Sequence, residues 1–118
     1  MGRLSTHVLD TTRGRPAAHV AVEVLRLEAD GAWRSLKKTS TNGDGRTDEP
    51  LLSGAALTAG VYMLSFAVGA YFRSSGAVIS EPPFLDFVPL RFSVADAAAN
   101  YHVPLIVTPW SYATYRGS

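Results

Sequence analysis

Hydrophobic and polar residues alternate along most of the chain, with the period of two that is typical of a strand with one buried face. Residues 18–28 show this best, because Val20, Val22 and Val24 share one face and β-branched residues, which favour strands, are dense. The same alternation predicts further strands at residues 4–10, 32–40, 60–68, 88–96, 101–109 and 111–117.

The segments between these strands carry turn-forming residues. Gly14 and Pro16 mark a turn, and Asp30-Gly31 predicts a tight hairpin. The run "TNGDGRTDEP" contains Asn-Gly and Asp-Gly and is predicted to be a loop.

Helix signals are nearly absent. Residues 69–76, "GAYFRSSG", allow at most a turn or two of helix, and Pro82-Pro83 make the following segment irregular. Seven or eight short strands without a strand–helix–strand rhythm predict an all-β sandwich, formed by a single domain over residues 1–118.

Two of the strands are apolar on both faces. Along residues 101–108, Tyr101, Val103, Leu105 and Val107 share one face, while His102, Pro104, Ile106 and Thr108 share the other. Residues 4–9 behave similarly, with Leu4, Thr6 and Val8 opposite Ser5, His7 and Leu9. A sandwich needs only one apolar face per sheet, so the second predicts a subunit interface.

Composition narrows the possible partners. A net charge of +1 with scattered basic residues gives no reason to expect nucleic acid or an anionic membrane. With no cysteine, disulfides, thiol catalysis and thiolate metal sites are excluded. No apolar signal segment or stretch of some 18 apolar residues is present, so a cytoplasmic protein is expected.

The candidate reactive groups are few. His7 and His102 each lie mid-strand on the face assigned to the interface, and His19 begins a strand at the surface. The residues alone leave open whether the two mid-strand histidines act as acid and base or only pack at an interface. A zinc site formed by the three histidines is not favoured, because no two of them have the short spacing that is typical of metal ligands. Arg46 follows the Gly-rich loop, where it is either solvated or presented to an anion.

Four segments together resemble the transthyretin-related 5-hydroxyisourate hydrolase family of purine degradation. They are the opening "LSTHVLDTTRGRPA", the loop "TNGDGR", the segment "YHVPL" and the ending "YRGS". The likeness covers nearly the whole chain, with the four segments in the family's order.

The resemblance implies a transthyretin-like sandwich of two four-stranded sheets with one short helix, assembled as a homotetramer that is a dimer of dimers. It implies hydrolysis of 5-hydroxyisourate in urate degradation without metal or cofactor, in a channel at the dimer–dimer contact. The catalytic residues that it implies are His7, Arg46, His102 and Ser118. Tyr115, Arg116 and Gly117 complete the implied substrate-binding set, so that the last residues lie inside the site.

Two other functions use the same fold. A transthyretin-type carrier would bind a small aromatic ligand in the channel without chemistry, and a structural module would bind none. A carrier needs neither two facing histidines nor the "YRGS" ending, and a structural module leaves His7, Arg46 and His102 unexplained as a group.

Overall fold

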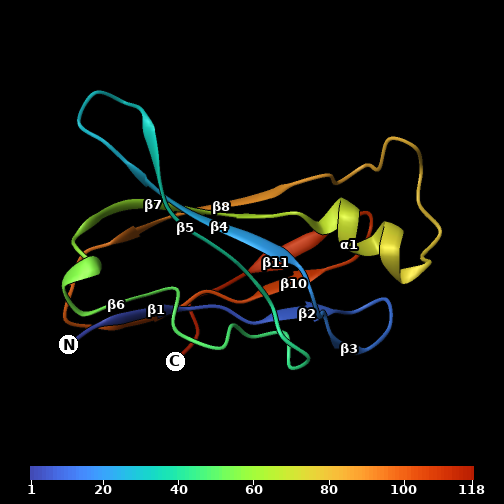
Figure 1. The fold of residues 1–118 in the computed structure, drawn as a ribbon, viewed down its shortest axis with the longest axis horizontal. Coiled ribbons are helices and arrows are strands. Elements are labelled where there is room, and N and C mark those ends of the chain that lie inside the picture. The colour runs from blue at the N-terminus through green and yellow to red at the C-terminus, as the bar shows by residue number, and fades with distance from the viewer.

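Two layers of strands face each other in the computed structural model, which describes residues 1–118 (Figure 1). One layer is an antiparallel sheet in the order β5-β4-β7-β8. Its strands are β4 (Ala21–Leu27), β5 (Trp33–Ser40), β7 (Gly60–Phe66) and β8 (Val88–Val94). β4 and β5 form the hairpin that Asp30-Gly31 predicts, whereas β7 pairs with β4 and with β8 across longer connections.

The second layer consists of seven short strands in two groups, β6-β1-β9 and β11-β10-β2-β3. In chain order they are β1 (Arg3–Ser5), β2 (Val8–Asp10), β3 (Arg15–Pro16), β6 (Leu52–Ser53), β9 (Asn100–His102), β10 (Leu105–Val107) and β11 (Tyr112–Thr114). The predicted transthyretin-like sandwich is confirmed, but this layer is divided where the resemblance implied one four-stranded sheet.

The division falls where two predicted strands are interrupted. β1 and β2 are separated at residues 6–7, and β9 and β10 at residues 103–104. Pro104 has no N–H to donate to a ladder. The segment from β1 to β2 and the segment from β9 to β10 nevertheless stay paired across the break. The Val103 N–H donates to the Ser5 carbonyl at 2.9 Å, and the Leu105 N–H donates to the His7 carbonyl at 2.9 Å.

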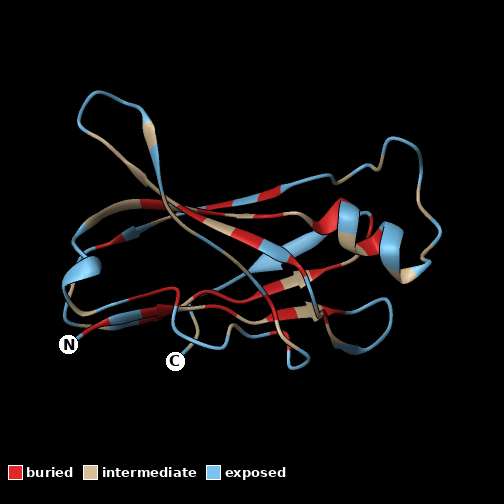
Figure 2. Ribbon diagram, viewed as in Figure 1, coloured by how far each residue is buried: buried red, intermediate tan, exposed pale blue.

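The core lies between the layers, where buried positions of both sheets face each other (Figure 2). Leu4, Val8 and Leu105 are fully buried, so the alternation assigned the inner faces of these strands correctly. Ser5 and His7 on the opposite face are only half-buried. The second layer therefore has an outer face that is neither core nor fully exposed surface.

Helical structure is confined to a short 3₁₀ turn, η1 (Gly54–Ala56), and to α1 (Val68–Ser75). The α1 helix ends at Gly76, whose φ of 78° lies in the left-handed region that glycine adopts readily. Phe72 packs the helix onto the core. Neither helix has the length and hydropathy needed to cross a bilayer.

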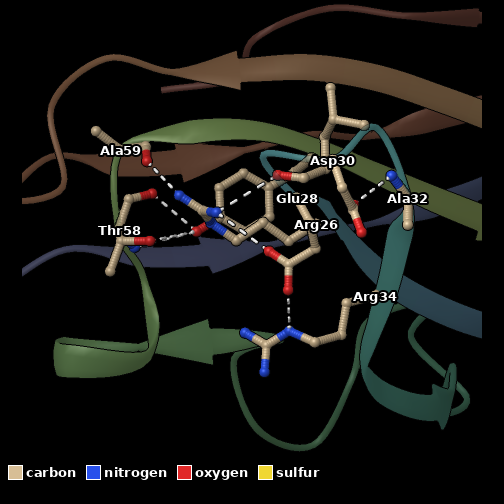
Figure 3. Close-up of polar contacts among 9 residues, drawn as sticks. Arg26, Glu28, Asp30, Ala32, Arg34, Thr58 and Ala59 are labelled. Carbon is tan, nitrogen blue, oxygen red and sulfur yellow. Dashed lines mark hydrogen bonds and ion pairs between the residues drawn. The ribbon is translucent and has the colours of Figure 1, made fainter.

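The β4–β5 hairpin extends beyond the sandwich and is tied to it by one arginine (Figures 1 and 3). Arg26 donates from Nη2 to the Ala59 carbonyl at 2.6 Å, and its guanidinium carbon lies 5.7 Å from the centre of the Tyr62 ring. Glu28 accepts from Arg34 at 2.8 Å and lies 3.8 Å from Arg26. Three charged side chains of this hairpin, those of Arg26, Glu28 and Arg34, thus interact with one another.

Candidate active site

A hollow of about 410 Å³ opens on the second layer near the C-terminus, and it is lined almost entirely by polar residues. Its lining residues are Arg3, Ser5, Arg46, Asn100, His102, Tyr115, Gly117 and Ser118. A smaller hollow of about 230 Å³ adjoins it and shares Arg3, Ser5 and Arg46. Here the two are together called the groove.

A somewhat larger hollow lies elsewhere on the molecule. It measures about 440 Å³, lies between the β2–β3 turn and α1, and is lined by His19 but by none of the predicted site residues. His19 is exposed, as predicted for a surface residue, although its φ of 64° is unusual for a residue with a side chain. The three histidines therefore do not come together, and no group of three metal-binding side chains is present.

His102 is presented to the groove by strand pairing. It is the last residue of β9, and the parallel register of β1 and β9 aligns it with Ser5. The Ser5 hydroxyl lies 2.9 Å from His102 Nδ1. The alternation that buries Tyr101 and Val103 turns His102 outward.

His7 lies in the gap between β1 and β2, on the same outer face as Ser5. It does not line the groove itself in the single chain, but a Cβ on Gly45 would come within 3.2 Å of its Cδ2, so the loop carrying Arg46 covers it. Arg46 and His102 line the groove together, and the Arg46 guanidinium contributes to the lowered pKa of both His7 and His102.

The loop before Arg46 is held rigidly by backbone and amide hydrogen bonds. The Asn42 side chain accepts from the Asp44 N–H at 2.9 Å and from the Arg46 N–H at 3.3 Å, while the Asn42 N–H donates to the Arg46 carbonyl at 2.7 Å. The Val8 N–H donates to the Gly45 carbonyl at 2.8 Å and fastens the loop to β2. Arg46 is exposed and its guanidinium has no ion pair, so it is available to a ligand.

The C-terminal segment folds back across β9. The Gly117 N–H donates to the His102 carbonyl at 2.7 Å, which leaves Gly117 and Ser118 lining the groove with Tyr115. Arg116 points elsewhere: its guanidinium carbon lies 4.2 Å from the centre of the Tyr101 ring, and Nη2 donates to the Asn100 carbonyl at 3.2 Å. Of the predicted site residues, five line the groove: Arg46, His102, Tyr115, Gly117 and Ser118. His7 lies against the loop that carries Arg46, and Arg116 supports the C-terminal segment from outside the groove.

Both histidines have a pKa below the ordinary value. For His102 the causes are burial, then the Arg46 guanidinium, then His7. For His7 they are burial and then Arg46, opposed by the backbone and carboxylate of Asp44. Near neutral pH both imidazoles are therefore uncharged and able to accept a proton.

Sequence reasoning assigned no role to Arg3, Ser5 or Asn100, which also line the groove. The alternation carried a signal for two of them, because Arg3 and Ser5 precede His7 at intervals of two and share its face. Nothing local indicates Asn100, which lies beside the groove because β9 pairs with β1.

Known proteins resemble the chain over its full length. Residues 4–117 match the HIUase/transthyretin family. A 5-hydroxyisourate hydrolase of Ralstonia nicotianae is 54% identical over 118 residues, which cover 100% of each chain.

Solved structures agree with this match. (S)-Allantoin synthase has a TM-score of 0.94 and 44% identity over 99% of this chain, which spans only 44% of that longer one. Sea bream transthyretin, solved in complex with thyroxine, has a TM-score of 0.88 and 28% identity over 98% of this chain and 94% of its own.

Fold and groove together define a transthyretin-like sandwich that presents histidine and arginine on the outer face of one layer. The chain belongs to the HIUase/transthyretin family, and the resemblance drawn from the four sequence segments is confirmed.

Proposed function

We propose that the protein hydrolyses 5-hydroxyisourate to 2-oxo-4-hydroxy-4-carboxy-5-ureidoimidazoline, a step of urate degradation. The observation that carries the proposal is the groove, where the unpaired Arg46 and His102 line one hollow and His7 lies against the loop that carries Arg46. Both histidines also have a lowered pKa. The 5-hydroxyisourate hydrolase of Ralstonia nicotianae, which is 54% identical over the full length, supports the proposal.

The groove supplies what opening this ring requires. Hydrolysis breaks an amide-like C–N bond, so water must lose a proton, the carbonyl oxygen must bear negative charge, and the leaving nitrogen must gain a proton. One uncharged imidazole takes the proton as the water oxygen bonds to the carbonyl carbon. Arg46 stabilises the oxyanion, and the histidine pair returns the proton to the nitrogen as the C–N bond breaks.

The C-terminal residues act on the substrate in this scheme. Ser118 contributes a hydroxyl to the reacting groups, and Tyr115 and Gly117 shape the wall of the groove. Arg116 acts indirectly, because its stacking on Tyr101 holds the segment across β9.

We further propose that the active form is a homotetramer, a dimer of dimers, in which the groove is completed at the dimer–dimer contact. Strands β8 and β11 each lie at the edge of a sheet and pair with a neighbour on one side only, which leaves the other side free to pair with another chain. Phe84 and Trp110 are exposed and pack against each other with tilted rings whose centres lie 5.9 Å apart, and Ile106 is half-buried on the outer face. The cytoplasmic location remains a prediction.

A carrier function is the second candidate, because sea bream transthyretin holds thyroxine within the same fold. A carrier gains nothing from paired histidines with a lowered pKa beside a free guanidinium. The two functions therefore differ in whether the bound molecule is converted.

The test generates 5-hydroxyisourate from urate and follows the decay of its ultraviolet absorbance with the protein, without it, and with a His102→Asn variant. The hydrolase accelerates the decay in proportion to enzyme concentration, and the variant does so far less. Decay at the uncatalysed rate, accompanied by saturable binding of an aromatic ligand, would favour the carrier.

A further inference from the structure

The imidazole of His102 is held from two sides. On one side the Ser5 hydroxyl lies 2.9 Å from Nδ1, within hydrogen-bonding distance. The bond joins strands that the backbone already pairs, because residues Arg3–Ser5 align with Asn100–His102 in parallel register. The Ser5 side chain is therefore not needed to hold the strands together.

On the other side the ring meets the backbone of Gly117. An added Cβ at this glycine would lie 2.5 Å from His102 Cδ2 and 3.2 Å from Cγ, closer than atoms can approach without displacement. The Gly117 N–H bond to the His102 carbonyl, at 2.7 Å, fixes that approach. With Nδ1 engaged and the Cδ2 edge covered, Nε2 is the ring nitrogen left for the groove.

The charge in the groove selects one of the two neutral forms of the ring. Arg46 lines the groove together with His102 and has no ion pair. A cation favours an imidazole whose lone pair faces it over one whose N–H faces it. The favoured form therefore has its proton on Nδ1 and its lone pair on Nε2.

We propose that Ser5 is a positioning residue that accepts the Nδ1–H of His102, so that the Nε2 lone pair faces the groove and makes His102 the base that deprotonates water. The part concerning water rests on the proposed hydrolysis. Nε2 takes one proton of the attacking water while the oxygen bonds to the substrate carbonyl carbon. The same proton then passes to the leaving nitrogen as the C–N bond breaks, and His102 returns to its neutral form.

The test compares Ser5→Ala, which removes the acceptor, with Ser5→Thr, which retains a hydroxyl and suits a strand. Ser53→Ala is the matched control, because Ser53 lies exposed on β6 of the same sheet and makes no side-chain capping bond. Each protein is examined by absorbance kinetics and by nitrogen–proton correlation spectra of its histidine rings across a pH titration.

The expected wild-type spectrum shows His102 protonated at Nδ1 and free at Nε2. Ser5→Ala should mix the two neutral forms and lower kcat about 10- to 100-fold, with KM changed much less, as for a misplaced catalytic group. Ser5→Thr should restore most of kcat and the single form, and Ser53→Ala should match the wild type. Gly117→Ala, which pushes on the other side of the ring, should also lower kcat.

Three results would overturn the assignment: a wild-type His102 protonated at Nε2, an unchanged ring spectrum in Ser5→Ala, or a Ser5→Thr variant no better than Ser5→Ala. The ring spectra need no turnover. If the wild type shows the expected form but does not accelerate decay of 5-hydroxyisourate, the hydrolase proposal fails while Ser5 is still shown to position His102.

Discussion

In the proposed reaction His7 and His102 act as positioned, uncharged imidazoles, so their replacement should lower turnover by a predictable amount. His7→Asn or His102→Asn should lower turnover of 5-hydroxyisourate by roughly 10²–10⁴-fold, the usual contribution of a placed acid or base. Asparagine keeps a polar side chain of similar reach, so fold and assembly should survive. Absorbance kinetics beside light scattering checks both points.

A variant with near-normal turnover would remove that histidine from the mechanism. A variant that dissociated, and lost activity for that reason, would indicate a residue that only packs at an interface.

The lowered pKa of these histidines couples stability to pH. In the unfolded chain each titrates near 6.5, whereas burial and Arg46 lower the pKa in the folded protein. Below about pH 6.5 the unfolded chain binds more protons than the folded protein does. The free energy of unfolding is therefore highest above that pH, and it falls as the pH approaches the lower pKa values of the two histidines in the folded protein. The free energy of unfolding should thus decline on acidification.

Urea denaturation over this pH range measures the effect. A His7→Asn, His102→Asn double variant should show a shallower decline, and an equal slope in both proteins would assign the pH dependence to other groups. Turnover should decline over the same range, because a protonated imidazole cannot accept a proton from water.

The sequence predicted a site at His7, Arg46 and His102 because these residues lie within segments that resemble a family. It did not identify the partner of His102, since the contact with Ser5 joins residues separated by 97 positions and depends on strand register. Arg116 was grouped with its neighbours, yet it stacks on Tyr101; beyond β11 the chain is irregular, and alternation no longer indicates where a side chain points.

Among the elements, the loop from residue 41 to residue 50 depends most on its glycines. Gly45 has a φ of 74°, and an added Cβ would lie 3.0 Å from Pro16 Cβ and 3.2 Å from His7 Cδ2. Gly45→Ala should lower the free energy of unfolding by about 1–3 kcal/mol, as expected for a strained left-handed residue. It should also lower turnover by displacing Arg46 or His7. Chemical denaturation and absorbance kinetics measure the two effects.

Gly43→Ala is the control within the same loop, because an added Cβ there meets nothing within 4 Å and the backbone is not left-handed. It should leave stability and turnover close to wild type. Equal effects at both glycines would mean that general loop flexibility matters more than the close approach at Gly45.

Most strands were predictable because their alternation is long. Strand β6 has only two residues, too few for a period to appear, and the breaks within the second layer are invisible to alternation, which continues through residues 4–10. Pro104, which has no N–H to donate, is the local cause of the break between β9 and β10. The opposite break, at residues 6–7, has no such sequence marker.

At the scale of the whole molecule, a substitution on the half-buried outer face of the second layer tests the proposed tetramer. Ile106 pairs with Leu9 and Ala113 across this face. Ile106→Glu should convert tetramers to dimers, because a buried unpaired carboxylate is costly, and activity should fall with it. Light scattering measures the mass.

Ser35→Glu is the control, since it places the same charge at an exposed position on β5. It should leave mass and activity unchanged. An intact and active Ile106→Glu tetramer would show that the face lies outside the subunit contact.

The parallel pairing of β1 with β9 has a consequence for synthesis. The first strands leave the ribosome nearly the whole chain ahead of their partners β9 and β10, whereas β4, β5, β7 and β8 pair only with one another and all precede β9 in the chain. A nascent chain can therefore form the hairpin sheet while its N-terminal residues wait unpaired. The proposed groove can form only after β9 and the segment around Gly117 have been made, so a chain truncated before β9 should be inactive even where its four-stranded sheet has formed.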